Sequence, residues 1–151
     1  MNINKSLIKK LYLENNSKYF DNKLQMTRID YRIDHSIHNL AGCCFLHKNN
    51  KLHIKFYVSD MYVWEEETLN LIILHEMIHI YLYMIFKDGD RKHHTKFKNA
   101  CTEFYNNFNI SIPIDGSFIP LNEQGIKAKS ANKKTHNIFL LALNYLLNKL
   151  F

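Results

Sequence analysis

The sequence predicts a single α+β domain. Its 151 residues suffice for one hydrophobic core, and 46% of them are hydrophobic. The hydrophobic pattern also changes period along the chain: it is helical over residues 5–19, alternating in short runs over residues 27–59, and nearly continuous over Leu69–Phe86. The predicted order is an N-terminal helix, a three-stranded antiparallel meander, a buried helix and a further helix.

Residues 5–19 form the first predicted helix, because apolar residues recur there at near-helical spacing with lysines between them. The strands follow from alternation. Apolar residues alternate with charged ones over residues 27–34, as in a strand with one buried face. Over Leu52–Val58 the apolar residues alternate with His53, Lys55 and Tyr57. Leu40–Leu46 is predicted as the strand between them, and Lys48–Lys51 as the turn of a hairpin.

The buried helix carries the run His75-Glu76-Met77-Ile78-His79, an H-E-x-x-H motif. On a helix the two histidines lie one turn apart on one face, which lets both imidazoles bind a single metal ion. Glu76 projects close to that face, where a carboxylate can take a proton from a water that the metal has acidified. The motif predicts a zinc hydrolase site with Glu76 as the general base.

Two other interpretations of this segment compete with a metal site. The three polar side chains could make ordinary core hydrogen bonds, but burying two imidazoles and a carboxylate is costly unless a partner satisfies them. The stretch Thr68–Phe86 is also about long enough to span a membrane, but three ionisable groups near its centre would be penalised in lipid. We therefore expect a buried metal-binding helix and no membrane partner.

A catalytic zinc site needs a third protein ligand besides its solvent position. Residues 87–90 predict a turn, and the adjacent His93 and His94 are the downstream histidines close enough for a short turn to return to the metal. Phe97 lies four residues after His93 and would share its inward face at the start of the next helix. This spacing favours His93, and His94 remains an alternative ligand.

The charge of the chain bears on its partners. A net charge of +6 favours an anionic partner such as nucleic acid, although a solvated basic surface fits the same composition. Basic residues gather just beyond the predicted metal helix, at Lys87, Arg91, Lys92, Lys96 and Lys98.

The cysteines and the first residues bear on the compartment. Cys43, Cys44 and Cys101 form no C-x-x-C pair, so neither a disulfide framework nor a cysteine zinc knuckle is predicted. No continuous apolar run follows the first lysines, so no signal peptide is predicted. We expect a cytoplasmic protein with reduced cysteines.

The residues after the last predicted core helix are expected to form an extension. Ile110–Ile114 suits a short edge strand, where Pro113 is tolerated. Residues 115–132 are polar and contain glycine and proline, which predicts a basic loop. Residues 135–151 predict an amphipathic helix that packs on the same domain. The predicted organisation is a domain over residues 1–110 and an extension over residues 111–151.

Taken in order, these motifs resemble the SprT-like zinc metallopeptidases, a family that includes the Spartan proteases. The resemblance covers about Leu7–Phe108, and its most specific part is the H-E-M-I-H run with His93 and Phe97 downstream. Weaker matches lie at Tyr19-Phe20-Asp21, Leu24, Ala41-Gly42, His53-Ile54, Ser59 and Asp90.

The resemblance implies a minimal zincin-like domain in which His75, His79 and His93 bind Zn²⁺ and Glu76 is the general base. It implies hydrolysis of peptide bonds in a protein or peptide substrate, which in Spartan is a protein crosslinked to DNA. The chain departs from the family pattern in two places. Lys92-His93-His94 stands where Gly-His-Gly is usual, and the 151 residues contain no cysteine zinc ribbon.

Two rival functions fit the same residues. The first is a nucleic-acid-binding module with a structural zinc, which predicts salt-sensitive DNA binding and no effect of Glu76→Gln. The second is a metal hydrolase that acts on something other than peptides. For a peptidase, an extended substrate is expected to pair with the meander edge near Ala41–Cys44. The oxyanion-stabilising side chain is expected among Tyr81, Tyr83, Tyr105 and His94.

Overall fold

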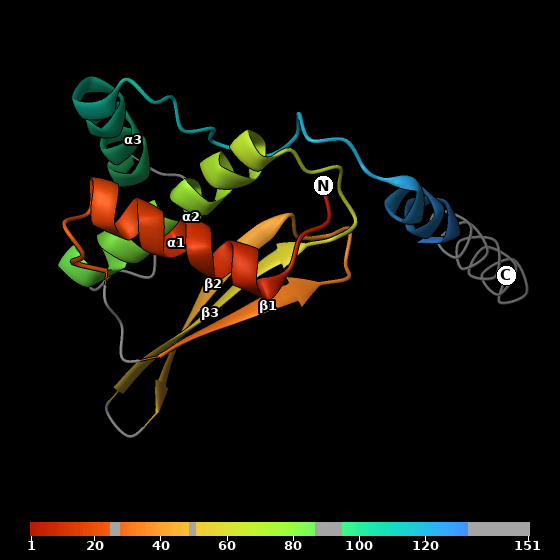
Figure 1. Cartoon of the computed structure of the whole chain (residues 1–151), viewed down its shortest axis with the longest axis horizontal. Helices are drawn as coiled ribbons and strands as arrows, with labels where there is room; N and C mark the ends of the chain where they lie inside the picture. Colours follow the sequence, from red (N-terminus) through yellow and green to blue (C-terminus); the bar gives the residue numbers. More distant parts are fainter. Residues whose placement is uncertain (25–27, 49–50, 87–94, 133–151) are drawn as a thin grey trace, which may run out of the picture.

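The computed structural model describes residues 1–24, 28–48, 51–86 and 95–132 (Figure 1). This part of the chain is an α+β fold, as the sequence predicts, and residues 123–132 are also helical. The main elements in chain order are α1 (Lys5–Tyr19), β1 (Ile29–Asp34), β2 (Ala41–Lys48), β3 (Lys51–Ser59), α2 (Glu66–Phe86) and α3 (Thr95–Phe108).

The sheet is mixed, so the predicted antiparallel meander is wrong. The strand order is β1-β3-β2, in which β3 pairs parallel with β1 and antiparallel with β2. Alternation decides which face of a strand is buried, but it does not decide which strand lies beside it. The six residues 35–40 between β1 and β2 can span at most about 20 Å. To reach β2 from β1, the loop must cross β3, a distance of two strand spacings or about 10 Å. The loop is therefore long enough to pass the end of β3.

Ser59, at the end of β3, holds the crossing loop in place. Its backbone N–H donates to the carbonyl oxygen of Leu40 at 2.8 Å, and its hydroxyl donates to the carbonyl oxygen of Ser36 at 2.6 Å. Ser59 itself is fully buried. The result is that β2 lies on the outer side of β3, at the edge of the sheet.

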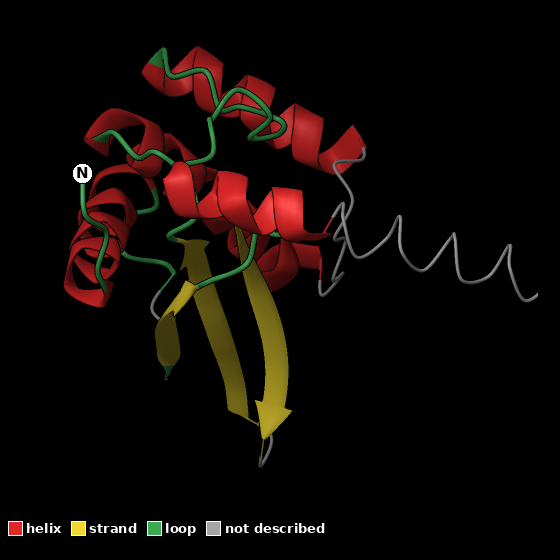
Figure 2. Cartoon of the chain, turned by 90° about the vertical axis from the view of Figure 1, so that its right-hand side faces the viewer, coloured by secondary structure: helices red, strands yellow, loops and turns green. Residues whose placement is uncertain are grey.

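α1 and α2 pack on one face of the sheet, α3 packs on α2, and the β2–β3 hairpin projects beyond them (Figures 1 and 2). Ile54, Phe56 and Val58 alternate along β3 and are completely buried on that face. Tyr12 of α1 packs on Phe56 with ring centroids 5.9 Å apart and an interplanar angle of 76°. The alternate residues of β3, such as Tyr57, therefore lie on the opposite face.

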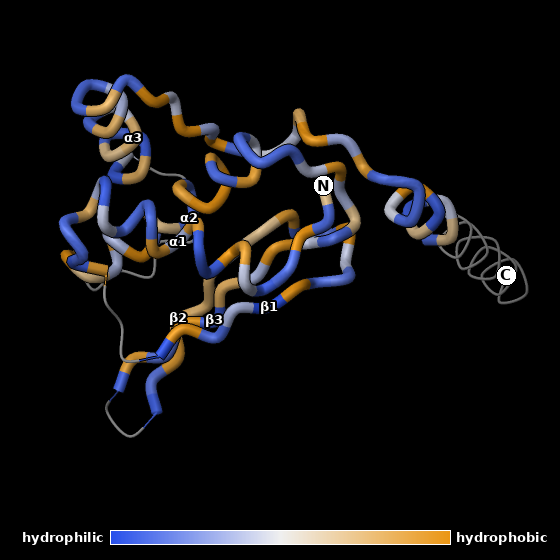
Figure 3. Tube along the Cα trace, viewed as in Figure 1, coloured by the Kyte–Doolittle hydropathy of each residue, from blue (hydrophilic) through white to orange (hydrophobic). Residues whose placement is uncertain are grey.

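α2 is the central helix and contacts α1, α3 and β2. Apolar residues run through it, as Figure 3 shows, and Leu69, Ile73 and Leu74 are completely buried. Among the described residues it is the one helix with the length and hydropathy of a membrane span, and 56% of its most apolar stretch is buried in the fold. Core helices pass the same test, so this likeness carries little weight.

Two predictions for the residues after α3 are wrong. Ile110–Ile114 is irregular rather than a strand, and residues 123–132 are helical rather than a loop. The side chain of Asn122 accepts a hydrogen bond from the N–H of Gly125 at 2.9 Å, which caps the start of this helix. Residues 133–151, including the predicted C-terminal helix, lie outside the described residues.

The burial of α2 gives a prediction about stability. Ile73 is completely buried, whereas Ile85 on the same helix is 51% exposed. Ile73→Ala is expected to lower the free energy of unfolding by about 2–4 kcal/mol because it leaves a cavity. Ile85→Ala, the matched control, is expected to change it by less than about 1 kcal/mol. Chemical denaturation followed by circular dichroism measures both, and equal losses would contradict the assigned core.

Candidate metal centre

α2 brings the two motif histidines together. The Nε2 atoms of His75 and His79 lie 3.3 Å apart, and the ring planes are inclined by 67°. Two nitrogens that each bind one tetrahedral zinc ion at its usual distance lie about 3.3 Å from each other. The pair is therefore spaced as two ligands of one ion would be, without any rearrangement of the helix.

The second nitrogen of His75 has a backbone partner. Nδ1 of His75 lies 2.7 Å from the carbonyl oxygen of Pro113. A carbonyl can only accept, so Nδ1 carries the proton and donates it. In the neutral imidazole this leaves the lone pair on Nε2, the atom that faces His79. Pro113 thus selects the tautomer that a metal ligand needs, and it belongs to the segment that the sequence predicts as an edge strand.

Phe97 of α3 packs against both imidazoles. Its ring centroid lies 4.7 Å from that of His75 and 4.3 Å from that of His79, with a nearly parallel arrangement on His79. Phe97 is 1% exposed, so it faces inward as the sequence predicts. An apolar ring on this side restricts the rotation of both imidazoles and brings the start of α3 next to the motif.

The predicted third ligand, His93, and its alternative, His94, both lie outside the described residues. Within the part of the chain that the structure describes, no group of three histidine, cysteine, aspartate or glutamate side chains could hold a metal ion. The donor set there consists of His75 and His79, and two imidazoles suit zinc among other transition metals. The third ligand stays a prediction.

Glu76 is buried beside the histidines, with 8% of its surface exposed. Burial raises the pKa of its carboxyl group to about 7, and hydrogen bonds from the side chain and backbone of Cys43 lower it by less. The Cys43 thiol also donates to the backbone carbonyl oxygen of Glu76 at 3.8 Å. A bound cation would favour the charged carboxylate and reduce the pKa. β2 therefore contacts α2 at the residue that the sequence predicts as the general base.

A pocket of about 440 Å³ opens beside these residues. Within the described ranges no strand pairs with the outer edge of β2, which forms one wall. An extended chain lying along that edge would cross the face of α2 that carries the motif. The pocket is lined by residues 39–45, Tyr57, Ile72, His75, Glu76, His79, Asp115 and Gly116.

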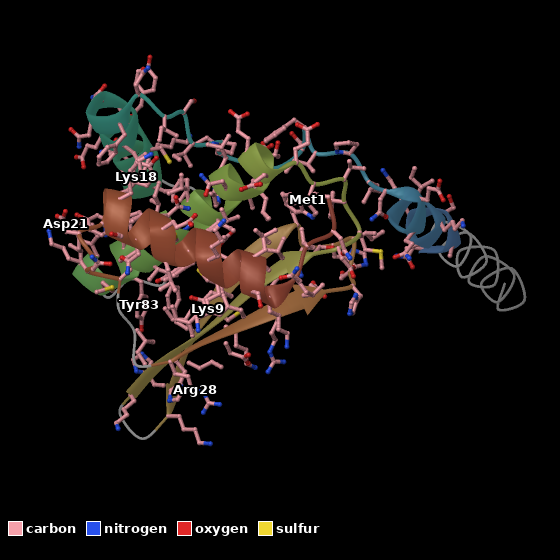
Figure 4. All side chains as sticks on the ribbon, in the orientation of Figure 1. Met1, Lys9, Lys18, Asp21, Arg28 and Tyr83 are labelled. Carbon is pink, nitrogen blue, oxygen red and sulfur yellow. The ribbon has the colours of Figure 1, made fainter. Side chains whose placement is uncertain are left out.

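The tyrosines that the sequence offers for oxyanion stabilisation do not line this pocket. The hydroxyl of Tyr83 lies 2.7 Å from Nε2 of His47, and its ring stacks on Phe45 with centroids 4.1 Å apart. Figure 4 shows Tyr83 directed from α2 towards the hairpin. Tyr81 packs on Phe20 instead, and Tyr105 is 51% exposed on α3. His94, the fourth candidate, lies outside the described residues.

Tyr57 is a pocket residue that sequence reasoning missed. Alternation places it on the face of β3 opposite the helices, yet it lines the same pocket as His75 and Glu76. Burial and the nearby Cys44 and Glu76 raise the pKa of its hydroxyl, which therefore stays protonated near neutral pH. The sequence did contain a signal, because a glycine, Gly42, stands opposite Tyr57 in the hairpin.

The chain matches one known family over most of its length. A model of the SprT-like family matches residues 8–115, which is more than two thirds of the chain and includes most of α1, the sheet, α2 and α3. No curated protein shows a significant match to this chain. The SprT-like family is associated with zinc and with metallopeptidases. By the extent of this match, the chain belongs to the SprT-like family.

Proposed function

We propose that this protein is a zinc-dependent metallopeptidase that hydrolyses peptide bonds in the cytoplasm. The observation that carries the proposal is the convergence of the His75 and His79 Nε2 atoms, 3.3 Å apart, beside the buried Glu76. Membership of the SprT-like family supports the same reaction class. The open pocket along β2 provides space for a polypeptide next to these groups.

His75 and His79 would hold the zinc ion, with His93 as the third ligand. Phe97 supports this choice, because its ring packs on both imidazoles near the start of α3. In a helix that extended back to position 93, His93 would share the face of Phe97. His94 is the alternative. When bound, zinc supplies a Lewis acid that polarises the scissile carbonyl and makes water more acidic.

Glu76 would act as the general base and then as the general acid. It takes a proton from the attacking water and passes it to the departing amine. The hydrogen bonds from Cys43 hold the carboxylate in place, and the Pro113 carbonyl keeps the tautomer of His75 fixed. The contribution of the chain is therefore a carboxylate and two imidazoles that are oriented before the substrate arrives.

The substrate would bind as an added strand on the outer edge of β2. The N–H and C=O groups on an open edge can pair with an extended peptide. The residues that line the pocket from this side are consecutive, 39–45, so the added strand would run along the pocket. A protein substrate must then present a locally unfolded or extended segment.

We further propose that DNA-associated or DNA-crosslinked proteins are among the substrates. The net charge of +6 and the exposed Lys48 and Lys51 at the end of the projecting hairpin support an anionic partner. The same features support the rival function, a DNA-binding module in which zinc is only structural. The two functions differ in whether zinc and Glu76 are needed for a chemical reaction.

A cleavage assay with casein and with a DNA-bound protein tests the proposed function. Zinc-loaded protein is expected to cleave casein, to lose this activity when a chelator removes the metal and to regain it when zinc is restored. Addition of DNA is expected to accelerate cleavage of the DNA-bound protein at low salt but not at high salt. Salt-sensitive DNA binding without cleavage of either substrate would favour the rival function.

A further inference from the structure

The side chain of Tyr57 lies across Gly42. The two residues are paired in the antiparallel β2–β3 ladder. A Cβ atom added to Gly42 would lie 2.3 Å from the phenol oxygen of Tyr57 and 2.5 Å from its Cζ atom. Real Cβ atoms essentially never make non-bonded contacts this short, so the phenol occupies the space that the Cβ of any other residue at position 42 would fill.

The phenol reaches from the centre of the sheet to its edge. Tyr57 begins on β3, the central strand, and the end of its side chain is the part nearest to Gly42 on β2. The side chain thus covers the full distance between the two strands. Tyr57 also lines the pocket that contains His75 and Glu76, so its hydroxyl lies where a strand added to β2 would pass.

An added strand would bring one of its own side chains to this place. Residues that face each other on neighbouring strands point to the same face of the sheet, with their Cβ atoms about 4.5–5.5 Å apart. The substrate residue that faces Gly42 would therefore point to the face on which the Tyr57 phenol lies. A short side chain fits beside the hydroxyl, but a long one collides with it.

We propose that Tyr57 determines specificity by limiting the substrate residue that faces Gly42 to a short side chain. This inference rests on the proposed function, because it requires a peptide along β2. The alternative is a purely structural role, since an aromatic ring that covers a glycine on a neighbouring strand stabilises a sheet. A structural role would affect stability without changing which peptides are cleaved.

The position of the Tyr57 phenol can be tested by measuring thermal stability, without an activity assay. Gly42→Ala is expected to lower the melting temperature by on the order of 4 °C, because the new Cβ displaces the phenol. In the Tyr57→Ala background the same change is expected to have less than half this effect, since the obstacle is gone. Equal effects in the two backgrounds would show that the phenol does not lie over Gly42 and would overturn the proposal.

The specificity is tested with a peptide library in which one position at a time is varied. Wild-type protein is expected to prefer glycine, alanine or serine over leucine at one subsite. Tyr57→Ala is expected to reduce this preference by about 10-fold or more. Tyr57→Phe, which removes only the hydroxyl and keeps the ring, is expected to reduce it by less. Tyr105→Phe, on the exposed surface of α3, is the control and should match the wild type.

Binding of the same peptides to Glu76→Gln, with and without Tyr57→Ala, separates the two proposals. If wild-type protein cleaves peptides and Tyr57→Ala leaves the profile unchanged, the specificity proposal fails and the proposed function stands. If nothing is cleaved but Tyr57→Ala changes the binding preference at one position, the proposed function fails and the subsite stands. Absence of both cleavage and peptide binding would overturn both.

Discussion

Glu76→Gln is expected to reduce kcat/KM for peptide hydrolysis by about 10²–10⁴-fold, the usual contribution of a general base. Glutamine has nearly the same shape as glutamate but cannot accept a proton from the attacking water. Burial already disfavours the charged form of Glu76, since it raises the pKa to about 7. The neutral amide should therefore be tolerated, and the melting temperature should stay the same or rise slightly.

Three measurements on the same sample make this test decisive. Hydrolysis of a fluorogenic peptide gives kcat/KM, elemental analysis gives the zinc content, and circular dichroism gives the melting temperature. Glu67→Gln is a matched control, because Glu67 is an exposed acid on the same helix, and it should behave as the wild type. A Glu76→Gln protein that is folded, zinc-loaded and within about 10-fold of wild-type activity would remove Glu76 from the mechanism.

The core of the candidate site is predictable from sequence because its geometry is local. The spacing of four residues between His75 and His79 places both side chains on one face of any α-helix. The apolar residues around them indicate a buried helix, and α2 includes the whole predicted segment Leu69–Phe86. The inward position of Phe97 follows from helical periodicity as well, because Phe97, Cys101 and Phe104 recur at helical spacing and are the buried residues of α3.

The surroundings of the site depend on contacts between distant parts of the chain, and these are not encoded in a local pattern. The carbonyl of Pro113 reaches His75 from 38 positions away, and every residue type offers such a carbonyl. The order of the strands depends on which way the loop 35–40 crosses, so the parallel pairing of β1 with β3 was not predictable from alternation. Tyr57 enters the pocket only because Gly42 leaves room above β2.

The helix over residues 123–132 is a different kind of error, because a local signal was present. Asn122 is a favourable N-cap residue, and it is followed by Glu123 and Gln124, both suited to the first turn of a helix. The glycines and the proline nearby outweighed this signal in the prediction of a loop. Gly116 and Pro120 precede the cap, so they limit only where this helix begins.

His79→Ala is expected to weaken zinc binding by more than about 100-fold, because loss of a residue that merely supports a ligand already costs about 10–100-fold. His75→Ala should have a similar effect, because the Nε2 atoms of His75 and His79 lie 3.3 Å apart and would bind the same ion. Competition with a coloured chelator measures the affinity. His38→Ala is the control, because His38 is exposed and lies outside the pocket.

The same measurement on His93→Ala and His94→Ala identifies the third ligand. Only one of the two adjacent side chains can share the helical face of Phe97, so only one variant should lose zinc, and we expect it to be His93→Ala. Bound zinc stabilises the folded protein by about 2.7 kcal/mol when its free concentration is 100 times the dissociation constant. Zinc should therefore raise the melting temperature of the wild type and of His94→Ala, but not that of His79→Ala or His93→Ala. If His79→Ala bound zinc as tightly as the wild type, the metal would lie elsewhere, and the convergence of the two imidazoles would be an ordinary feature of a buried core.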